Sequence, residues 1–191
     1  MTYSPPLLCR LAGAFAIVLG LALAGPAAAQ DKKASPPVLV TSLGQSLDAF
    51  QVQLAVRRAG IKFKYDPRAE IDQLDDAKTL FLAVGASLKG FGDAGITIKD
   101  ELARAGHLLD AAKSRGITIV VLHMGGEERR DALSNQLIEL TAPRAQRLII
   151  REDSDADGLF ARIAKDNKIP LAIIDNVTNL KQPLQELFAG S

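Results

Sequence analysis

Residues 38–46 read VLVTSLGQS, an apolar run suited to a buried β-strand that passes directly into a polar, glycine-bearing segment. Similar runs recur as FLAV at 81–84 and TIVVL at 118–122. Strands that are apolar on both faces are typical of a parallel sheet covered on each side by helices. Joined by right-handed β-α-β connections, they predict a three-layer, doubly wound α/β domain with a mainly parallel sheet of about five or six strands, flavodoxin-like or Rossmann-like.

The rest of the chain alternates β-rich runs with amphipathic segments. We expect strands at residues 38–42, 61–64, 79–84, 117–123, 147–150 and 171–174, and helices at 46–59, 98–115, 130–140, 157–167 and 180–188. Gly60 and Gly116 fall where the C-terminal caps of two of these helices belong. The glycine-rich stretch GASLKGFGDAG (85–95) is expected to be a mobile flap.

Residues 1–29 are expected to be a secretory signal peptide. Arg10 is the only charged side chain before an apolar run at 11–24, and the small residues at 26–29 supply an A-x-A cleavage site. The apolar run is shorter than a membrane-spanning helix requires, so cleavage near Ala29 is favoured over a membrane anchor. The sequence therefore predicts an exported, periplasmic protein without membrane contact after cleavage, with a polar tether at 30–37 and a single domain at 38–191.

Composition argues against several classes of partner and cofactor. Without residues 1–30 the chain keeps 22 Lys and Arg (23 less Arg10) against 22 Asp and Glu, which gives no reason to expect nucleic acid as a partner. The single cysteine lies in the signal segment, and His107 and His123 show no zinc-binding spacing, so neither a disulfide nor a metal centre is expected. The residues around Gly44 match neither the dinucleotide nor the phosphate-loop pattern, so no nucleotide cofactor is expected.

Candidate ligand-binding residues lie where the expected strands end, because ligands of open parallel sheets bind beyond the carboxyl ends of the strands. After the first, third and fourth strands these residues are Thr41, Ser42, Gly44, Gln45, Ser46, Gly85, Ser87, Lys89, His123, Gly125, Gly126 and Arg129. Gly44 would let the backbone approach a ligand, and Ser46 with the following helix N-terminus would meet an anion. Alternatively, Ser46 is only a helix N-cap and Gly44 a turn residue.

The charged and nucleophilic candidates also have two interpretations. Lys89 either contacts an anion from the flap or is solvated on a long loop. His123 is either functional or a hydrogen-bonded structural group. Ser42 or Ser87 with His123 and Asp175 would form the trio of a hydrolase or transferase, although the chain has no G-x-S-x-G elbow.

The segment DSDADG at residues 153–158 is similar to the start of a calcium-binding loop. Ala164 stands where the bidentate glutamate of such a loop belongs, so the pattern lacks its decisive ligand. We therefore favour the interpretation that these acids precede and begin a helix, where they interact favourably with its dipole.

Several blocks resemble an exported bacterial family known as domain of unknown function 6305. They are V-T-S-x-G-Q-S with Asp48, R-A-G-I-K-F-x-Y-D-P (58–67), V-G-A-S-x-K-G with A-G-I (84–96), H-M-G-G-E-x-R-R (123–130), D-G-L-F (157–160) and I-P-L (169–171). The resemblance extends over about residues 38–188 and implies neither a reaction nor a ligand. It does imply that the recognisable blocks fall on the same strand ends that the residues indicate.

The preferred hypothesis is a periplasmic binding or sensing module for a small anionic metabolite. Ser42, Gln45 and Ser46 would supply hydrogen bonds, and Lys89 and Arg129 would supply positive charge. The alternatives are a Ser/His-dependent hydrolase or transferase, and a protein-interaction module of an envelope complex.

Overall fold

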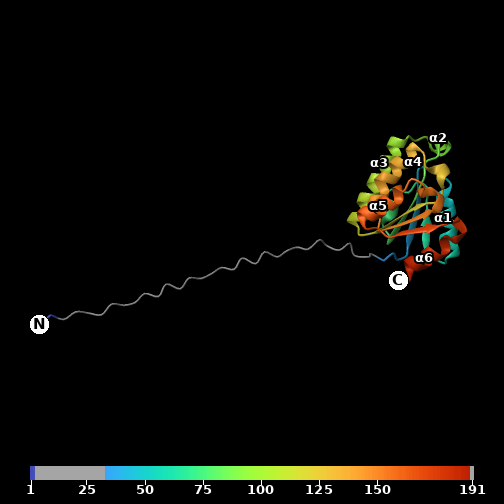
Figure 1. Ribbon diagram of the computed structural model, residues 1–191. Helices are drawn as coiled ribbons and strands as arrows, with labels where there is room; N and C mark the ends of the chain where they lie inside the picture. The colour runs from blue at the N-terminus through green and yellow to red at the C-terminus, as the bar shows by residue number, and fades with distance from the viewer. Residues whose placement is uncertain (3–32, 190–191) are drawn as a thin grey trace. The chain divides into compact units, whose positions relative to one another are not determined.

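A six-stranded, all-parallel sheet forms the centre of the domain in the computed structural model, which describes residues 1–2 and 33–189. The strand order is β2-β1-β3-β4-β5-β6. Figure 1 shows the sheet and its helices, coloured from the N-terminus to the C-terminus. The strands are β1 Val38–Leu43, β2 Phe63–Tyr65, β3 Thr79–Val84, β4 Thr118–His123, β5 Arg147–Arg151 and β6 Leu171–Ile174. The three-layer, doubly wound α/β fold expected from the sequence is confirmed. Apart from Met1 and Thr2, the predicted signal peptide lies outside the described residues.

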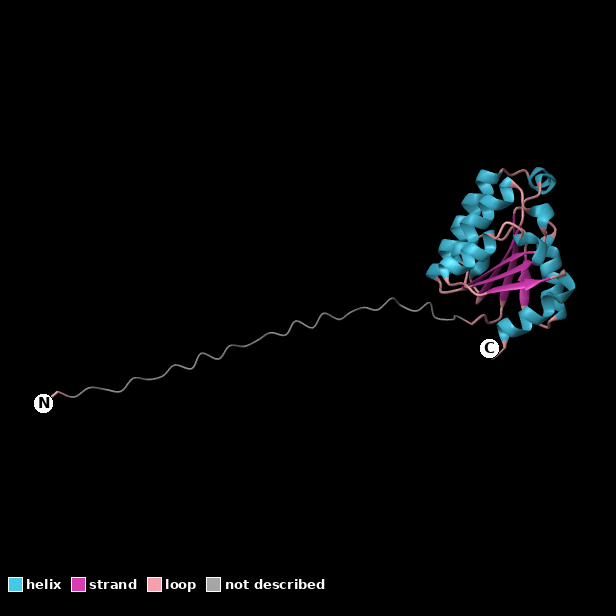
Figure 2. Cartoon of the chain, viewed as in Figure 1, coloured by secondary structure: helices cyan, strands magenta, loops and turns pink. Residues whose placement is uncertain are grey.

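Helices cover both faces of the sheet (Figure 2). They are α1 Asp48–Arg58, α2 Leu88–Ala94, α3 Ile98–Ser114, α4 Ala132–Thr141, α5 Leu159–Asn167 and α6 Lys181–Phe188. Side chains of α3, α4 and α5 pack on one face, and those of α1 and α6 pack on the other. Alternate residues of β3 point to opposite faces of the sheet. Leu82 packs on the face covered by α3, α4 and α5, Phe81 packs on the face covered by α1 and α6, and both are fully buried. Because β3 is covered on both faces, it is apolar at every position except Thr79 at its start.

The strand order reverses between β1 and β3, which is where ligand sites of doubly wound sheets form. Leu43 at the end of β1 pairs in register with Val84 at the end of β3, and Ala83 pairs with Leu122 of β4. The carboxyl ends of β1, β3 and β4 are therefore neighbours. We call the segments that follow them (residues 44–48, 85–87 and 124–130) the rim.

Two local predictions are wrong. Residues 88–94 form α2 rather than a mobile flap, because Ser87 accepts a hydrogen bond from Gly90 N at 3.1 Å and Gly95 ends the helix with a φ of 65°. The glycines within this segment lower its helix propensity and conceal the helix in the sequence. Helix α1 begins at Asp48 with Leu47 as its N-cap, so Ser46 lies one residue before the cap, although its hydroxyl accepts a hydrogen bond from Asp48 N at 3.3 Å.

Half of the predicted tether belongs to the folded domain. Ala34 is fully buried, and Ser35 exchanges hydrogen bonds of 3.0 and 2.9 Å with the Thr79 hydroxyl. The carbonyl of Pro37 accepts a hydrogen bond from Lys78 N at 2.9 Å. Among residues 1–2 and 33–189, no helix has the length and apolar character needed to cross a membrane.

Candidate functional site

The loops that follow β1 and β3 pair closely with each other. Gly85 N donates to Leu43 O at 2.9 Å, and Ser87 N donates to Gly44 O at 2.8 Å. Gly44 has a φ of 109°, and a Cβ at this position would lie 2.3 Å from Gly85 O. Gly44 is therefore required for the approach of the two loops, and the backbone fills the space between β1 and β3 at this level.

A buried ion pair on α3 supports the loop after β1. Arg104 Nε lies 2.8 Å from Glu101 Oε2, and Glu101 Oε1 accepts hydrogen bonds from Gly44 N at 2.7 Å and Gln45 Nε2 at 3.0 Å. Arg104 also donates to the Ser42 carbonyl. Burial alone would raise the pKa of Glu101, but Arg104 and the Gly44 N–H outweigh it and hold that pKa below its usual value. This pair was not predicted from the sequence, although the E-x-x-R spacing at 101–104 places both side chains on the same face of a helix.

The side chains of Thr41 and Ser42 face the interior. Both are fully buried in β1. Thr41 Oγ1 accepts a hydrogen bond from Ala69 N at 3.3 Å, and the Ser42 hydroxyl contacts Ser46 O at 3.5 Å. The structure therefore gives both hydroxyl groups internal partners rather than an opening to solvent.

A compact cluster forms where Asp48, in the first turn of α1, meets the ends of β3 and β4. A Cβ on Gly85 would lie 3.0 Å from Asp48 Oδ2 and 3.5 Å from Ser46 Oγ. A Cβ on Gly125 would lie 2.9 Å from Asp48 Oδ2 and 2.0 Å from Arg129 Cγ. The two glycines thus leave room for the carboxylate and the arginine stem to meet. We call Ser46, Asp48, Gly85, Gly125 and Arg129 the Asp48 cluster.

Asp48 is the residue of this cluster that was not among the candidates. Its side chain is only 5% exposed, and Oδ2 has no hydrogen-bond partner among the residues that the structure describes. Burial raises the pKa of the Asp48 carboxyl group, and this effect is partly offset by His123, Ser46 and the nearby arginines. The sequence signal was present, since Asp48 belongs to the first of the blocks that carry the family resemblance.

His123 contacts backbone carbonyl groups at the ends of two neighbouring strands. Its side chain is fully buried, with Nδ1 2.7 Å from Val84 O, Nε2 3.4 Å from Gly126 O, and the ring centroid 5.4 Å from that of Phe160. Burial lowers the pKa of His123, so the neutral form is favoured, and we assign the proton to Nδ1, which donates to Val84 O. His123 thereby joins the ends of β3 and β4.

Arg129 differs from the other basic side chains at these strand ends. Three of them have carboxylate partners: Lys89 pairs with Asp93, Arg130 with Asp157, and Arg151 with Asp153. Lys89 is 84% exposed on α2. Arg129 donates from Nη1 to Ala86 O at 3.1 Å and has no ion-pair partner in the described part of the chain.

Gly126 and an open cavity lie on the β5 side of the rim. Gly126 has a φ of 66°, and a Cβ there would lie 2.7 Å from Arg151 Nη2. Arg151 also lines a cavity of about 340 Å³ together with Arg58 of α1 and residues 176–178 after β6. The residues that line this cavity lie outside the rim, and Arg151 connects the cavity to Gly126.

The structure does not bring the proposed nucleophilic trio together. Ser42 lies on β1 and His123 on β4, with β3 between them, and Asp175 follows β6 beyond β5. Asp175 is exposed and accepts a hydrogen bond from Asn179 Nδ2 at 2.6 Å. Ser87 is the N-cap of α2.

The acids of the DSDADG segment have partners within the protein. Asp155 accepts hydrogen bonds from Phe160 N at 2.7 Å and Ala161 N at 3.0 Å in the first turn of α5. Asp153 and Asp157 pair with arginines. Within the described residues no group of three His, Cys, Asp or Glu is placed to hold a metal ion. The geometry supports the helix-capping interpretation.

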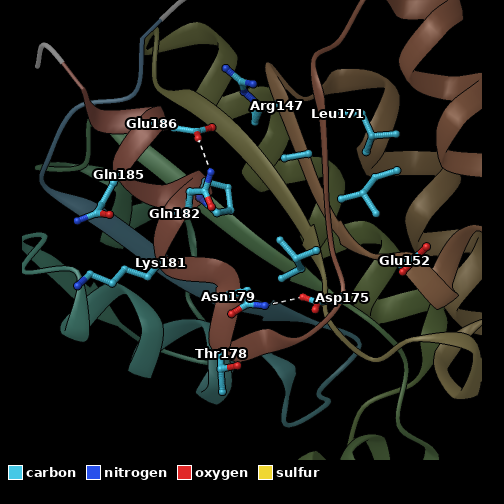
Figure 3. Close-up of a pocket in the computed structure, with 14 residues that line it drawn as sticks. Arg147, Glu152, Leu171, Asp175, Thr178, Asn179, Lys181, Gln182, Gln185 and Glu186 are labelled. Atoms are coloured by element: carbon cyan, nitrogen blue, oxygen red, sulfur yellow. Dashed lines mark hydrogen bonds between the residues drawn. The ribbon is translucent and has the colours of Figure 1, made fainter.

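A separate groove of about 1030 Å³ runs along the edge strand β6 and helix α6 (Figure 3). Figure 3 shows Asn179 bonded to Asp175 at one end and Gln182 bonded to Glu186 at the other. The sequence does not predict this groove, because the order of the strands in the sheet decides which strand lies at an edge.

Comparisons with known proteins identify a family and assign no activity. Residues 35–188 match the family model described as "Domain of unknown function (DUF6305)". No curated protein matches the chain. Among solved structures, a GDSL-like lipase from Bacteroides thetaiotaomicron is similar, with 12% sequence identity, a TM-score of 0.36, and coverage of 74% of this chain and 68% of that chain.

Proposed function

The chain belongs to the DUF6305 family, a domain of unknown function, and we propose that it is a binding or sensing module for a small anionic metabolite. The proposed site is the Asp48 cluster at the carboxyl ends of β1, β3 and β4. We further propose that the protein acts in the periplasm, because residues 1–29 carry the pattern of a cleaved signal peptide.

The observation that supports this proposal is that Arg129 has no ion-pair partner among the described residues. Its guanidinium group has one hydrogen bond to a backbone carbonyl and no carboxylate partner within residues 33–189, whereas its basic neighbours are paired. A guanidinium group binds carboxylate and phosphate groups through paired, charge-assisted hydrogen bonds. Arg129 is thus the rim side chain with unused capacity for an anion.

Asp48 limits the kind of anion that fits. Its Oδ2 is buried without a hydrogen-bond partner among the described residues, and an acceptor in that state costs free energy until it finds a donor. A ligand that also carries a hydroxyl group, such as a hydroxycarboxylate or hydrogen phosphate, would bond to Arg129 through its charge and donate to Asp48. The Ser46 hydroxyl, which lies on the same side of Gly85, supplies a further hydrogen bond.

Thermal unfolding of the purified protein against phosphate, sulfate, simple carboxylates and hydroxycarboxylates tests the proposal. A ligand present at about 100 times its dissociation constant adds about 2.7 kcal/mol to the free energy of unfolding, which raises Tm by several degrees. We expect Arg129→Ala to remove the shift while the fold persists. Lys89→Ala is the matched control and retains the shift, because Lys89 is exposed and paired with Asp93.

Other outcomes would relocate or replace the site. Binding that survives Arg129→Ala but is lost in Arg58→Ala would place the ligand in the cavity between α1 and β6. If no compound shifts Tm and a pull-down returns one stoichiometric partner, the rim is a protein-interaction surface instead. A hydrolase or transferase is not proposed, since β3 separates Ser42 from His123, Asp175 follows β6 on the far side of β5, and Ser87 caps helix α2.

A further inference from the structure

Strand β6 is an apolar edge strand. It pairs with β5 on one side, from Leu148↔Leu171 to Arg151↔Ile174, and no strand of residues 33–189 pairs with its other side. Its sequence, LAII, contains no charged residue, and Ile173 is 55% exposed. Natural edge strands are usually protected by charges, proline or bulges. At the opposite edge of the sheet, β2 has Lys64 at its centre, so only β6 lacks that protection.

The groove beside β6 has charged residues at both ends. Arg147 is the first residue of β5, and Glu152 follows its last residue. Because β5 and β6 are parallel and in register, Arg147 lies beside the start of β6 and Glu152 beside its end. Helix α6 runs back along the groove, because Asn179 just before it contacts Asp175, whereas Glu186 lines a small cavity together with Arg147. Figure 3 shows Arg147 and Glu186 at one end of the groove and Asp175 and Lys181 at the other.

This arrangement is self-complementary about a twofold axis. If β6 pairs antiparallel with β6 of a second copy, the start of each strand faces the end of the other. Arg147, which begins β5 one strand in from the edge, then lies at the same end of the interface as Asp175 of the second copy. On α6, which runs antiparallel to its symmetry mate, Lys181 faces Glu186 of the second copy, and Gln182 faces Gln185. Opposite charges therefore meet at both ends of the interface.

We propose that β6 and the groove along α6 form the interface of a homodimer in which the sheet continues from one copy into the other. The pairing satisfies the free backbone groups of β6 and buries Ile173 against the second copy. The interface shares no residue with the Asp48 cluster, so this inference and the proposed anion binding can fail independently.

Sedimentation equilibrium of the purified protein tests the proposal. We expect a dimer, and we expect Ile173→Lys to convert it to a folded monomer whose circular dichroism matches that of the parent. Lys64→Glu on the opposite edge strand is the control and leaves the dimer intact. A parent that is monomeric throughout the measured concentration range overturns the proposal, as does a dimer that Ile173→Lys leaves unchanged.

Charge reversal on α6 tests the twofold geometry itself. Lys181→Glu places like charges opposite each other at two symmetry-related positions, so we expect the dimer dissociation constant to rise about tenfold. Glu186→Lys has the same effect. The double variant Lys181→Glu/Glu186→Lys restores opposite charges and with them dimerisation. If the double variant dimerises no better than the single variants, the antiparallel arrangement is wrong.

Discussion

The backbone N–H of Gly44 donates a 2.7 Å hydrogen bond to Oε1 of Glu101, which joins the loop after β1 to helix α3. Glu101 is fully buried, and its charge is balanced by Arg104, whose side chain is 9% exposed. The loop after β1 is therefore stabilised by a buried ion pair that is distant in sequence: Glu101 and Arg104 follow Gly44 by 57 and 60 residues.

Glu101→Ala should strongly destabilise the domain. The substitution leaves the Arg104 guanidinium buried without its carboxylate and removes the acceptor of Gly44 N–H. Breaking a buried pair by removing one partner typically costs about 3–5 kcal/mol. Equilibrium unfolding in guanidinium chloride measures the loss. The control is Asp93→Ala, which breaks the exposed pair with Lys89 and should cost much less.

The same pair predicts a loss of stability in acid. The folded-state pKa of Glu101 lies below the usual value of 4.5, so its contribution is fully present above pH 4.5 and is lost as the pH falls through the folded pKa. Unfolding free energies between pH 6 and pH 3 should therefore fall more steeply in the parent than in Glu101→Gln. Equal slopes would show that the pair does not lower this pKa.

Asp48→Asn should stabilise the protein at neutral pH. Because burial raises the folded-state pKa of Asp48 above 3.8, stability falls as the pH rises from 3.8 through the folded value, and the full loss is present at pH values above it. Asparagine removes the charge and keeps a similar shape, so Tm should rise at pH 7. The gain should shrink as the pH falls towards 3.8, where the unfolded chain also becomes protonated. A lower Tm for Asp48→Asn at pH 7 would contradict this account.

The layers of the fold were predictable because they depend on local apolar runs. The predicted strands 79–84 and 171–174 have the observed bounds, since each is a short, mainly apolar segment. The strand predicted at 61–64 is observed at Phe63–Tyr65, because Ile61 N bonds to Val56 O and so completes the end of α1. Strand bounds shift where a neighbouring helix end uses the first residues of the strand.

The rim was predicted only in outline, because its contacts depend on tertiary packing. The strand-end rule selects Gly125 and Arg129, but the rule does not show that Asp48 packs beside both. From the sequence, an acidic residue in the first turn of a helix is expected to interact with the helix dipole at the surface. Its burial depends on tertiary packing, which the sequence does not show. From the sequence, Lys89 is predicted to be an unpaired cation, because the glycines of residues 88–94 give no indication of helix α2. That helix places Asp93 Oδ2 2.5 Å from Lys89 Nζ.

Asp155→Ala should destabilise the domain by about 1 kcal/mol, the usual cost of losing a helix cap. The carboxylate accepts hydrogen bonds from two N–H groups in the first turn of α5, and alanine leaves both without that acceptor. Asp166→Ala, at an exposed position of the same helix, is the control and should cost less. Calcium should not change the Tm of either variant or of the parent. A calcium-dependent rise in Tm that Asp155→Ala abolishes would support the calcium-loop interpretation instead.

Gly125→Ala should weaken anion binding at the Asp48 cluster while the domain stays folded. The added methyl group would lie 2.0 Å from Arg129 Cγ and 2.9 Å from Asp48 Oδ2, so the arginine stem has to move. Gly92→Ala is the matched control, because a Cβ on Gly92 meets no atom within 4 Å. Calorimetric titration with the best anion of the panel should show a dissociation constant raised at least severalfold for Gly125→Ala and unchanged for Gly92→Ala. Equal affinities in both variants would place the anion away from Arg129, because the position of that side chain depends on the absence of a side chain at residue 125.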